Sequence, residues 1–468
     1  MLHPNMPGQY RNILRALLEE GDHEIVFLTK PEVQANIKGV KRINYTRRPS
    51  SGEGMHRYVR PLEDAVYDSQ AVWRICDQLK REGFVPDIII GHLGWGQGLY
   101  LKDVFPAAPT LSFFEYYYSA TSGAANFIPG EELSADAQAK LRTLNAHHLM
   151  NLTDSDWGVC PTLFQKLQHP EVFWPKMSVL HDGIDTDAAR PAPRPAPLRL
   201  ETFDGEVTVG GDGPVITYLA RNLEPYRGFP TFARAIPKIR RALPEARIVF
   251  IGGTDISYGR RLPGPLSYLD IMADEVDLSS ERVHFTGRVP YPVLLRLLQL
   301  SSAHVYLTVP FVLSWSMLEA MACEAPLIAS DTAPVREVVE DGVNGRLVDF
   351  FDEDELAEAV VETVRAPERF VAMRRRARQD IVRKYALATV MPHHLSLIHG
   401  LARGEPPIQA AEQIDHFNRA NGLDRHHPAH DEIRALNGAG AQMNRSRPAY
   451  IPDMESRIKA ARERRRNQ

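Results

Sequence analysis

The sequence predicts an α/β fold with two parallel sheets, each covered by helices on both faces. Segments typical of strands and of helices alternate along nearly the whole chain, which is the order that parallel sheets with helical crossovers require. The chain has 468 residues, too many for a single hydrophobic core. Residues 190–197 are rich in proline, which fixes φ and has no N–H, so they predict the start of a linker between two domains.

The first half begins with an amphipathic helix. Its apolar stripe consists of Ile13, Leu14, Leu17 and Leu18, and Gly21 ends it. The alternation then continues with a strand over 24–29, a helix over 65–80, a strand over 87–90, a helix that reaches His148 and a strand over 157–160.

A second alternating series begins at Val215. The strand over 215–219 is followed by a helix with apolar residues at helical spacing and by a strand over 247–251. The apolar residues of this helix are Phe229, Phe232, Ile236, Ile239 and Leu243. After residue 403 the pattern decays, so residues 404–468 are predicted to form an extended, partly disordered tail.

Composition excludes several classes of protein. The net charge of -4 argues against nucleic acid as a partner, because nucleic-acid-binding domains usually have a basic face. Cys76, Cys160 and Cys323 are widely spaced and odd in number, which fits reduced structural thiols. No apolar run reaches the ~20 residues of a membrane helix, and no signal peptide is recognisable. We therefore expect a cytoplasmic protein.

Two arginines follow the strand that begins at Val215. Residues 219–228 read LARNLEPYRG, so Arg221 and Arg227 lie on a short loop after a strand end. Guanidinium groups donate paired hydrogen bonds to phosphate oxygens, and the glycine after Arg227 allows close approach of a ligand. This pattern predicts a pyrophosphate site. In the alternative interpretation, both arginines lie on the surface and pair with Glu224.

A second strand-to-helix junction lies further along. Residues 310–321 read PFVLSWSMLEAM, and a helix is predicted to begin between Ser314 and Ser316. The first N–H groups of a helix have no partner within it, and its dipole favours a nearby anion. Together the two junctions indicate a nucleotide-sugar site.

These two segments, in this order and separation, resemble the donor half of family 4 glycosyltransferases, retaining enzymes with the GT-B fold. The resemblance continues through residues 283–289, 325–330 and 339–348, and it extends more weakly to 5–10 and 113–118. It implies two Rossmann-like doubly wound domains that face a cleft. The expected domains are 1–185 on the acceptor side, a linker over 186–213, a nucleotide-sugar domain over 214–383, a helix over 384–403 that returns to the first domain, and the tail over 404–468.

The resemblance also implies roles for individual residues. Arg221 and Arg227 would stabilise the departing diphosphate, and Glu319 would accept hydrogen bonds from the ribose hydroxyls. The base, of UDP or GDP type, would lie against the turn at Arg288 and Val289. The remaining donor-binding residues would be Gly8, Leu313, Ser314, Trp315 and Ser316.

The sugar side of the site departs from the family. Many members have a glutamate that contacts the sugar where this chain has Phe311, and a histidine near the position of Glu115. We expect Glu115 and His92 to bind the sugar or the acceptor, although His92 fits an ordinary packed histidine equally well. No metal or other cofactor is expected, because the family replaces the metal by basic side chains and a helix dipole; the pair Asp154 and Asp156 then only begins a strand.

The N-terminus is short by comparison with the family. Only residues 1–3 precede the loop at 6–9, which in the family follows a central strand. Either these residues serve as a stub of that strand or the true start lies upstream, and we favour the second explanation.

The function implied is transfer of a sugar from a nucleoside-diphosphate sugar to a carbohydrate or lipid-linked hydroxyl acceptor, in surface polysaccharide or glycolipid synthesis. The alternatives are a GT-B phosphorylase, a nucleotide-sugar epimerase, or an inactive GT-B binding or scaffold protein. The basic segment over 454–466 is either a solvated charge run or a peripheral contact with the inner membrane face.

Overall fold

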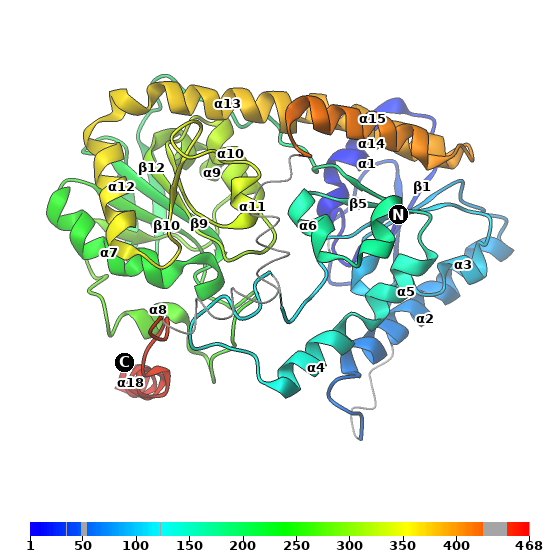
Figure 1. The fold of residues 1–468 in the computed structure, drawn as a ribbon, viewed down its shortest axis with the longest axis horizontal. Helices are drawn as coiled ribbons and strands as arrows, with labels where there is room; N and C mark the ends of the chain where they lie inside the picture. Colours follow the sequence, from blue (N-terminus) through cyan, green and yellow to red (C-terminus); the bar gives the residue numbers. More distant parts are fainter. Residues whose placement is uncertain (34, 48–53, 122, 425–446, 468) are drawn as a thin grey trace. The chain divides into compact units, whose positions relative to one another are not determined.

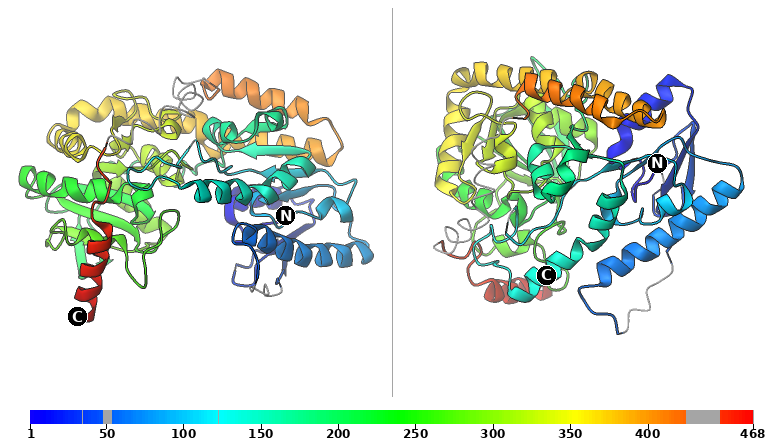
Figure 2. Two further views of the ribbon diagram at one scale, coloured as in Figure 1. Left: turned by 60° about the horizontal axis from the view of Figure 1, so that its bottom comes forward. Right: turned by 45° about the vertical axis from the view of Figure 1, so that its right-hand side comes forward.

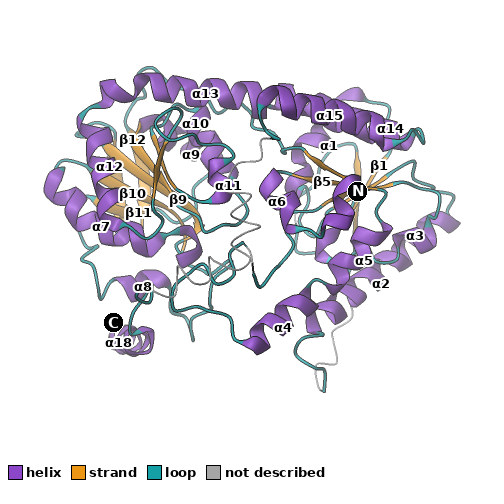
Figure 3. Cartoon of the chain, viewed as in Figure 1, coloured by secondary structure: helices purple, strands orange, loops and turns teal. Residues whose placement is uncertain are grey.

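The computed structural model describes residues 1–33, 35–47, 54–121, 123–424 and 447–467. The chain divides into two compact units. Unit 1 consists of Met1–Ser122, Leu133–Gly183 and Lys384–His426, and unit 2 of Gly123–Glu132, Ile184–Arg383 and His427–Gln468. Each unit contains a parallel sheet between helices, which confirms the predicted α/β fold (Figures 1 and 3).

The sheet of unit 1 is completed by the first residues of the chain. Its strands are β1 (Ile25–Thr29), β2 (Val40–Asn44), β3 (Ile89–Gly91), β4 (Thr110–Phe113), β5 (Trp157–Cys160) and β6 (Met177–Val179). β1 pairs with β2, and β3 to β6 pair in sequence order, all in parallel. Leu2 forms parallel bridges with both Leu28 and Gly91. Residues 1–3, the stub, therefore lie between β1 and β3, in the position of a central strand.

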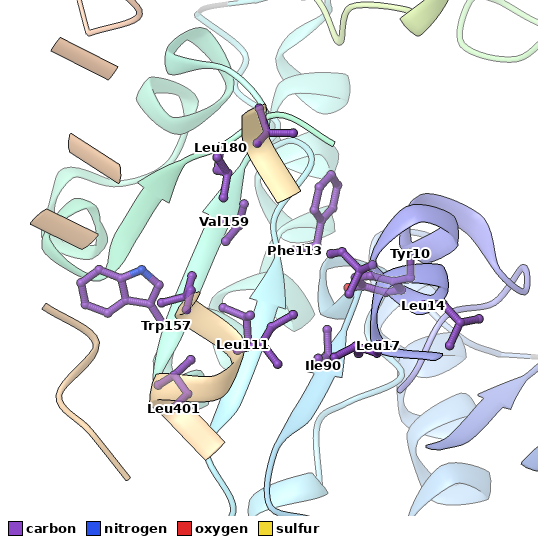
Figure 4. Packing of buried hydrophobic residues seen from close by; sticks show 14 of the residues in the cluster. Tyr10, Leu14, Leu17, Ile90, Leu111, Phe113, Trp157, Val159, Leu180 and Leu401 are labelled. Atoms are coloured by element: carbon purple, nitrogen blue, oxygen red, sulfur yellow. The ribbon is translucent and has the colours of Figure 1, made fainter. Parts of the chain in front are cut away.

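Helices cover both faces of this sheet. On one face lie α1 (Arg11–Glu20), α14 (Leu387–Ala402) and α15 (Pro407–Asn421), and on the other α2 (Arg60–Arg81) and α3 (Leu101–Val104). Figure 4 shows Leu14 and Leu17 of α1 beside Ile90, and Leu401 of α14 beside Trp157. Successive residues of β1 alternate between the two cores, so every residue of the strand is buried.

The sheet of unit 2 has six parallel strands in the order β11-β10-β9-β12-β13-β14. They are β9 (Val215–Asn222), β10 (Arg247–Gly253), β11 (Val283–Phe285), β12 (Ser301–Tyr306), β13 (Leu327–Ser330) and β14 (Arg346–Val348). The chain runs outward from β9 to β11 and then returns to place β12 on the other side of β9. The strand order therefore reverses between β9 and β12.

Helices also cover both faces of the second sheet. α7 (Phe229–Ala242) packs beside α12 (Glu353–Arg365), while α9 (Tyr291–Leu300) packs beside α10 (Trp315–Ala322) (Figure 1). The other helical segments are η1 (Gly8–Tyr10), η2 (Leu93–Trp95), α4 (Ala135–Leu144), α5 (Ala146–Asp154), α6 (Leu163–Gln168), η3 (Glu171–Lys176), η4 (Pro225–Arg227), α8 (Tyr268–Met272), α11 (Ala333–Arg336), η5 (Pro367–Phe370), α13 (Val371–Tyr385) and α18 (Met454–Asn467). Among the described residues, no helix is long and apolar enough to cross a membrane.

The region predicted as a linker contains a β-hairpin. β7 (Leu198–Thr202) and β8 (Gly205–Val209) pair antiparallel, and Leu200 and Val209 are buried against Val249 of the sheet. Both strands alternate apolar and polar residues, but the proline-rich segment before them concealed this pattern. Residues 186–213 thus belong to unit 2 rather than to a free linker.

The predicted extended tail is also ordered in part. α15 buries Ile414 in the core of unit 1, and residues 447–467 belong to unit 2, where α18 lies beside α8 (Figures 1 and 2). Tyr450 is buried; its ring packs on Phe350 and Phe351, and its hydroxyl bonds to the N–H and hydroxyl of Thr231 in the first turn of α7. Arg447 forms two hydrogen bonds with Asp349. The rest of the tail, 425–446 and 468, lies outside the described residues.

Removing the Tyr450 hydroxyl should destabilise unit 2. Tyr450→Phe leaves the buried N–H of Thr231 without its partner, at a cost of about 1–3 kcal/mol, and Tyr450→Ala also loses the ring packing, at about 3–5 kcal/mol in total. The midpoint of thermal unfolding should fall for Tyr450→Phe and fall further for Tyr450→Ala. Arg462→Ala, which changes an exposed residue of α18, is the control and should unfold like the unchanged protein. Equal midpoints for all four proteins would contradict a structural role for this segment.

Candidate functional site

The carboxyl ends of β9 and β12 lie side by side where the strand order reverses. In open parallel sheets, ligands bind in the crevice that this reversal creates outside the carboxyl ends of the strands. The loop after β9 carries Glu224 and Arg227, and the loop after β12 runs from residue 307 to the start of α10. Both segments that the sequence singled out therefore reach the same edge of one sheet.

Arg227 connects these two loops. Its Nη1 donates to Thr308 Oγ1 at 2.7 Å and to the backbone oxygen of Val312 at 3.1 Å. Its guanidinium carbon lies 5.3 Å from the ring centre of Tyr258, within the range of a cation–π contact. The side chain is only 6% exposed. Arg227 thus holds a positive charge in a fixed position at the strand-order reversal.

Arg221 has a different environment. It lies near the end of β9, is exposed, and makes no hydrogen bond or ion pair with any residue that the structure describes. Its guanidinium is therefore free to meet a ligand. The alternative interpretation, in which both arginines pair with Glu224, is wrong. The Glu224 carboxylate is fully buried and accepts the backbone N–H groups of residues 257–259 at 3.0 to 3.3 Å.

Glu224 organises the loop that follows β10. The Glu224 carboxylate binds the three N–H groups of this loop. In addition, the Asn222 amide donates to Ser257 Oγ at 2.7 Å. This fixes the backbone beside Tyr258, the residue whose ring faces Arg227. Arg288, after β11, is largely exposed and donates to Asn222 Oδ1 at 3.4 Å. Its neighbour Val289 instead packs toward the β7–β8 hairpin, so only its backbone can serve the site.

The start of α10 differs from the prediction of free N–H groups. The Ser314 N–H donates to the Tyr306 hydroxyl at 2.9 Å, and the Ser316 N–H donates to Ser314 Oγ at 3.3 Å. The Ser316 N–H is satisfied because Ser314 is the N-cap of the helix, and the Ser314 N–H is satisfied by Tyr306. Leu313 and Trp315 flank the cap and are partly buried. The helix dipole remains, but two of the expected donors are already used.

Glu319 lies further along α10 and is almost fully buried. Its neighbour is Tyr291 at the start of α9: burial, together with the negative charge of Glu319, raises the pKa of the Tyr291 hydroxyl. Phe311 is buried between two aromatic rings, 5.0 Å from Tyr258 and 6.3 Å from Tyr226 by ring centres. An aromatic cluster thus occupies the position where the resemblance leads one to expect a carboxylate.

The sugar-side residues predicted in the first half also lie together, within unit 1. Nε2 of His92 is 3.5 Å from a carboxylate oxygen of Glu115, and Gln9 Nε2 donates to the other oxygen at 3.4 Å. Gln9 Oε1 is 2.6 Å from Nε2 of His3. Gly8 has φ +55, and a Cβ there would lie 2.4 Å from the His3 ring. His3, Gln9, His92 and Glu115 form what we name the edge cluster, at the carboxyl ends of the stub, β3 and β4.

The edge cluster keeps Glu115 ionised. Burial acts to raise its pKa, but its interactions with His92, His3 and Gln9 outweigh this effect, so the pKa lies below its usual value. Burial and the neighbouring His92 lower the pKa of His3 to about 4, so this ring is neutral near pH 7. His92 is 2% exposed, and neither ring nitrogen has a hydrogen bond of normal geometry.

Other acidic and sulfur-containing groups have structural roles. Asp156 accepts the N–H and hydroxyl of Thr110 and so ties β5 to β4. The three cysteines are free and buried, as predicted. Among the described residues, one group of three converging metal-ligand side chains exists: Glu20 at the end of α1, His23 in the loop that follows it, and His399 on α14.

Sequence reasoning missed several residues of these sites. Gln9 follows the predicted Gly8, and His3 precedes it in the same segment. The contact of Gln9 with Glu115 and that of Gln9 with His3 depend on the folded backbone. Thr308 and Tyr258 gave no motif signal. They could be found only from the strand order, which places their loops beside Arg227.

Comparison with known proteins identifies both halves of the chain. A family model described as "Glycosyl transferase family 4 group" matches residues 21–189, and one described as "Glycosyl transferases group 1" matches residues 213–366. Together the two matches cover more than half of the chain.

Curated relatives match part of the sequence. A GDP-mannose-dependent alpha-(1-6)-phosphatidylinositol monomannoside mannosyltransferase of Mycolicibacterium smegmatis is 29% identical over 237 residues, which are 47% of this chain and 56% of the relative. A D-inositol 3-phosphate glycosyltransferase of Mycobacterium avium is 31% identical over 194 residues, 41% of this chain and 42% of the relative. The chain thus spans about half the length of the curated relatives it matches.

Solved structures share the fold over most of the chain. A sucrose-phosphate synthase from Thermosynechococcus elongatus has a TM-score of 0.62 at 18% identity, covering 84% of this chain and 93% of that one. Anabaena HepE in complex with UDP and glucose has a TM-score of 0.59 at 13% identity, covering 85% and 98%. At these identities the likeness shows the fold alone. The chain therefore has a region of the glycosyl transferase family 4 group over residues 21–189 and a region of glycosyl transferases group 1 over residues 213–366, and it has the GT-B fold.

Proposed function

We propose that this chain is a retaining glycosyltransferase that moves a sugar from a UDP- or GDP-sugar to a hydroxyl acceptor. The observation that carries the proposal is the pair of arginines at the end of β9 and in the loop that follows it: Arg227 is fixed by Thr308 and Val312, and the Arg221 side chain has no described partner. The relatives support it by their names, because they are glycosyltransferases and one is GDP-mannose-dependent. A neighbour in fold was solved with UDP and glucose.

The chemistry follows from where charge develops. Breaking the sugar–phosphate bond places negative charge on the departing diphosphate, so groups already aimed at that position lower the barrier. Arg227 supplies a charge that needs no reorganisation, Arg221 closes on the phosphates, and the α10 dipole adds to both. In this proposal the acceptor attacks from the leaving-group face and gives its proton to a phosphate oxygen. No metal or other cofactor takes part.

Nucleotide recognition is assigned to the edge between β9 and β11. Glu319 would accept the ribose hydroxyls, and the base would lie beside Arg288 and the backbone of Val289. Within unit 2, Leu313, Ser314, Trp315 and Ser316 would complete the donor contacts. On the acceptor side we assign Glu115 and His92, and Phe311 would form an apolar wall for the sugar through its contacts with Tyr226 and Tyr258.

The acceptor is proposed to be a carbohydrate or a lipid-linked carbohydrate, in surface polysaccharide or glycolipid synthesis. The mycobacterial relative acts on a phosphatidylinositol monomannoside, as its name states. We place the reaction in the cytoplasm, with α18 as a peripheral contact to the inner membrane face. Arg457 and Arg464 of this helix already pair with Glu275 and Asp274. Among its described side chains, the membrane contact would rest on the exposed Lys459 and Arg462.

Arg221→Ala tests the proposed activity. Loss of one oriented donor at a developing charge should lower turnover by about 10²- to 10³-fold, measured as release of UDP or GDP from the sugar donor. Thermal unfolding should not change, because the side chain has no described partner to lose. Arg227→Ala should lower turnover and the unfolding midpoint together, since it removes the bonds to Thr308 and Val312. The matched control is Arg241→Ala, an exposed arginine on α7. A fully active Arg221→Ala protein would refute the assignment.

Glu224→Gln tests the nucleotide loop. The substitution keeps the shape of the side chain but replaces an oxygen that accepts N–H groups of residues 257–259 by an amide, so this loop should loosen. We expect affinity for UDP or GDP, measured by calorimetry, to fall about tenfold, which corresponds to roughly 1.4 kcal/mol. Glu281→Gln, at an exposed position, serves as the control. Unchanged nucleotide affinity in Glu224→Gln would separate this loop from the site.

A further inference from the structure

An exposed tryptophan stands beside the edge cluster. The side chain of Trp95 is 56% exposed, the largest exposure of any tryptophan in the described residues. It ends η2, directly after β3 and His92, and the ring centres of His92 and Trp95 are 5.8 Å apart. His92 contacts Glu115 as well, so Trp95 and Glu115 flank the same histidine. Glu115 is itself 28% exposed and can be reached by a ligand.

The backbone that carries Trp95 is firmly held. Three carbonyl groups of this loop, those of Leu93, Gly94 and Gly96, are hydrogen-bonded by side chains of other elements, Asn151, His147 and Ser69. A Cβ at Gly96 would lie 2.4 Å from Ala65, so the backbone packs directly on α2. A large apolar ring kept in solvent by a rigid loop cannot fold inward to hide its surface. Such fixed exposed aromatic surface marks a binding site, because little ordering entropy is lost when a ligand covers it.

The two side chains offer complementary contacts. The indole face can cover the C–H groups of a sugar ring, and a carboxylate oxygen can accept hydrogen bonds from hydroxyl groups. Among the described residues, the side chains recorded as interacting with the Glu115 carboxylate are His92, His3 and Gln9, and none of these three is lysine or arginine. A phosphate beside Glu115 would therefore meet a negative charge without a permanent positive charge to offset it.

We propose that Trp95 and Glu115 form the acceptor site and that this site takes an uncharged sugar or polyol rather than a phosphorylated one. The proposal rests on the transferase function proposed above and names the acceptor class for it. It separates this chain from the relative named for inositol 3-phosphate, whose acceptor is anionic. A lipid-linked acceptor remains compatible with the site if the sugar that reaches Glu115 is itself uncharged.

Ligand-observed saturation-transfer NMR tests the proposal without any donor. The probes are the methyl glycosides of mannose, glucose, galactose and N-acetylglucosamine, with myo-inositol, each titrated against the full chain. Mannose 6-phosphate and inositol 1-phosphate are the anionic counterparts. We expect at least one neutral probe to bind, about tenfold or more tighter than its phosphorylated counterpart.

Three variants give the decisive comparison. Trp95→Ala should weaken binding of the neutral probe about tenfold or more, whereas Trp73→Ala, an exposed tryptophan on α2, should not. Glu115→Gln removes the charge but keeps the shape, so it should weaken the neutral probe and also reduce the preference over the phosphorylated probe. Thermal unfolding of each variant checks that the fold is intact. A preference that survives Glu115→Gln unchanged, a wild-type preference for the phosphorylated probe, or no binding of any neutral probe would overturn the proposal.

The outcome is distinguishable from failure of the transferase function. Binding of UDP and GDP is measured by calorimetry on the same protein. If a nucleotide binds and a donor sugar is released, but the neutral probes do not bind as expected, only the acceptor proposal is wrong. If the neutral probes bind as expected while no nucleotide binds, the acceptor class stands as a property of the site and the transferase function fails.

Discussion

The bonds from Arg227 to Thr308 and Val312 hold together the loops on either side of the strand-order reversal in unit 2. A buried guanidinium is costly unless its N–H groups are satisfied, so these bonds are a condition for keeping the charge in place. They also set the distance between the end of β9 and the start of α10. An arginine suits this role because it can donate to two acceptors and still lie over the ring of Tyr258, whereas lysine presents a compact point charge.

The two units differ in the charge they present at the carboxyl ends of their strands. Unit 2 offers guanidinium groups, one fixed and one free, with Glu224 turned inward onto backbone N–H groups. Unit 1 offers an ionised carboxylate, Glu115, among groups without a permanent positive charge. This difference supports a division of labour in which an anionic donor is bound by one unit and an uncharged hydroxyl compound by the other.

The sequence was sufficient for the α/β class, because strand alternation is a local signal. Short motifs also singled out Arg221, Arg227, His92 and Glu115, whose roles stay predictions. The sequence was insufficient where a partner lies far away in the chain. Arg227 bonds to Thr308 across 81 positions, and Tyr450 bonds to Thr231 across 219 positions. Neither contact has a local pattern. The hairpin of β7 and β8 did have a local pattern, the alternation of apolar and polar residues. The prolines before it led to the prediction of a linker instead.

Each unit is assembled from separate stretches of the chain. Unit 1 needs α14 and α15 to cover the core around α1, and unit 2 needs Tyr450 and α18 from the last part of the sequence. During synthesis the ribosome makes these segments after the strands of both sheets. The core around α1 cannot close before α14 and α15 have been made, so the apolar surface of α1 stays uncovered while both sheets are being synthesised. Chaperone demand in the cell should therefore be highest for nascent chains that have already produced both sheets.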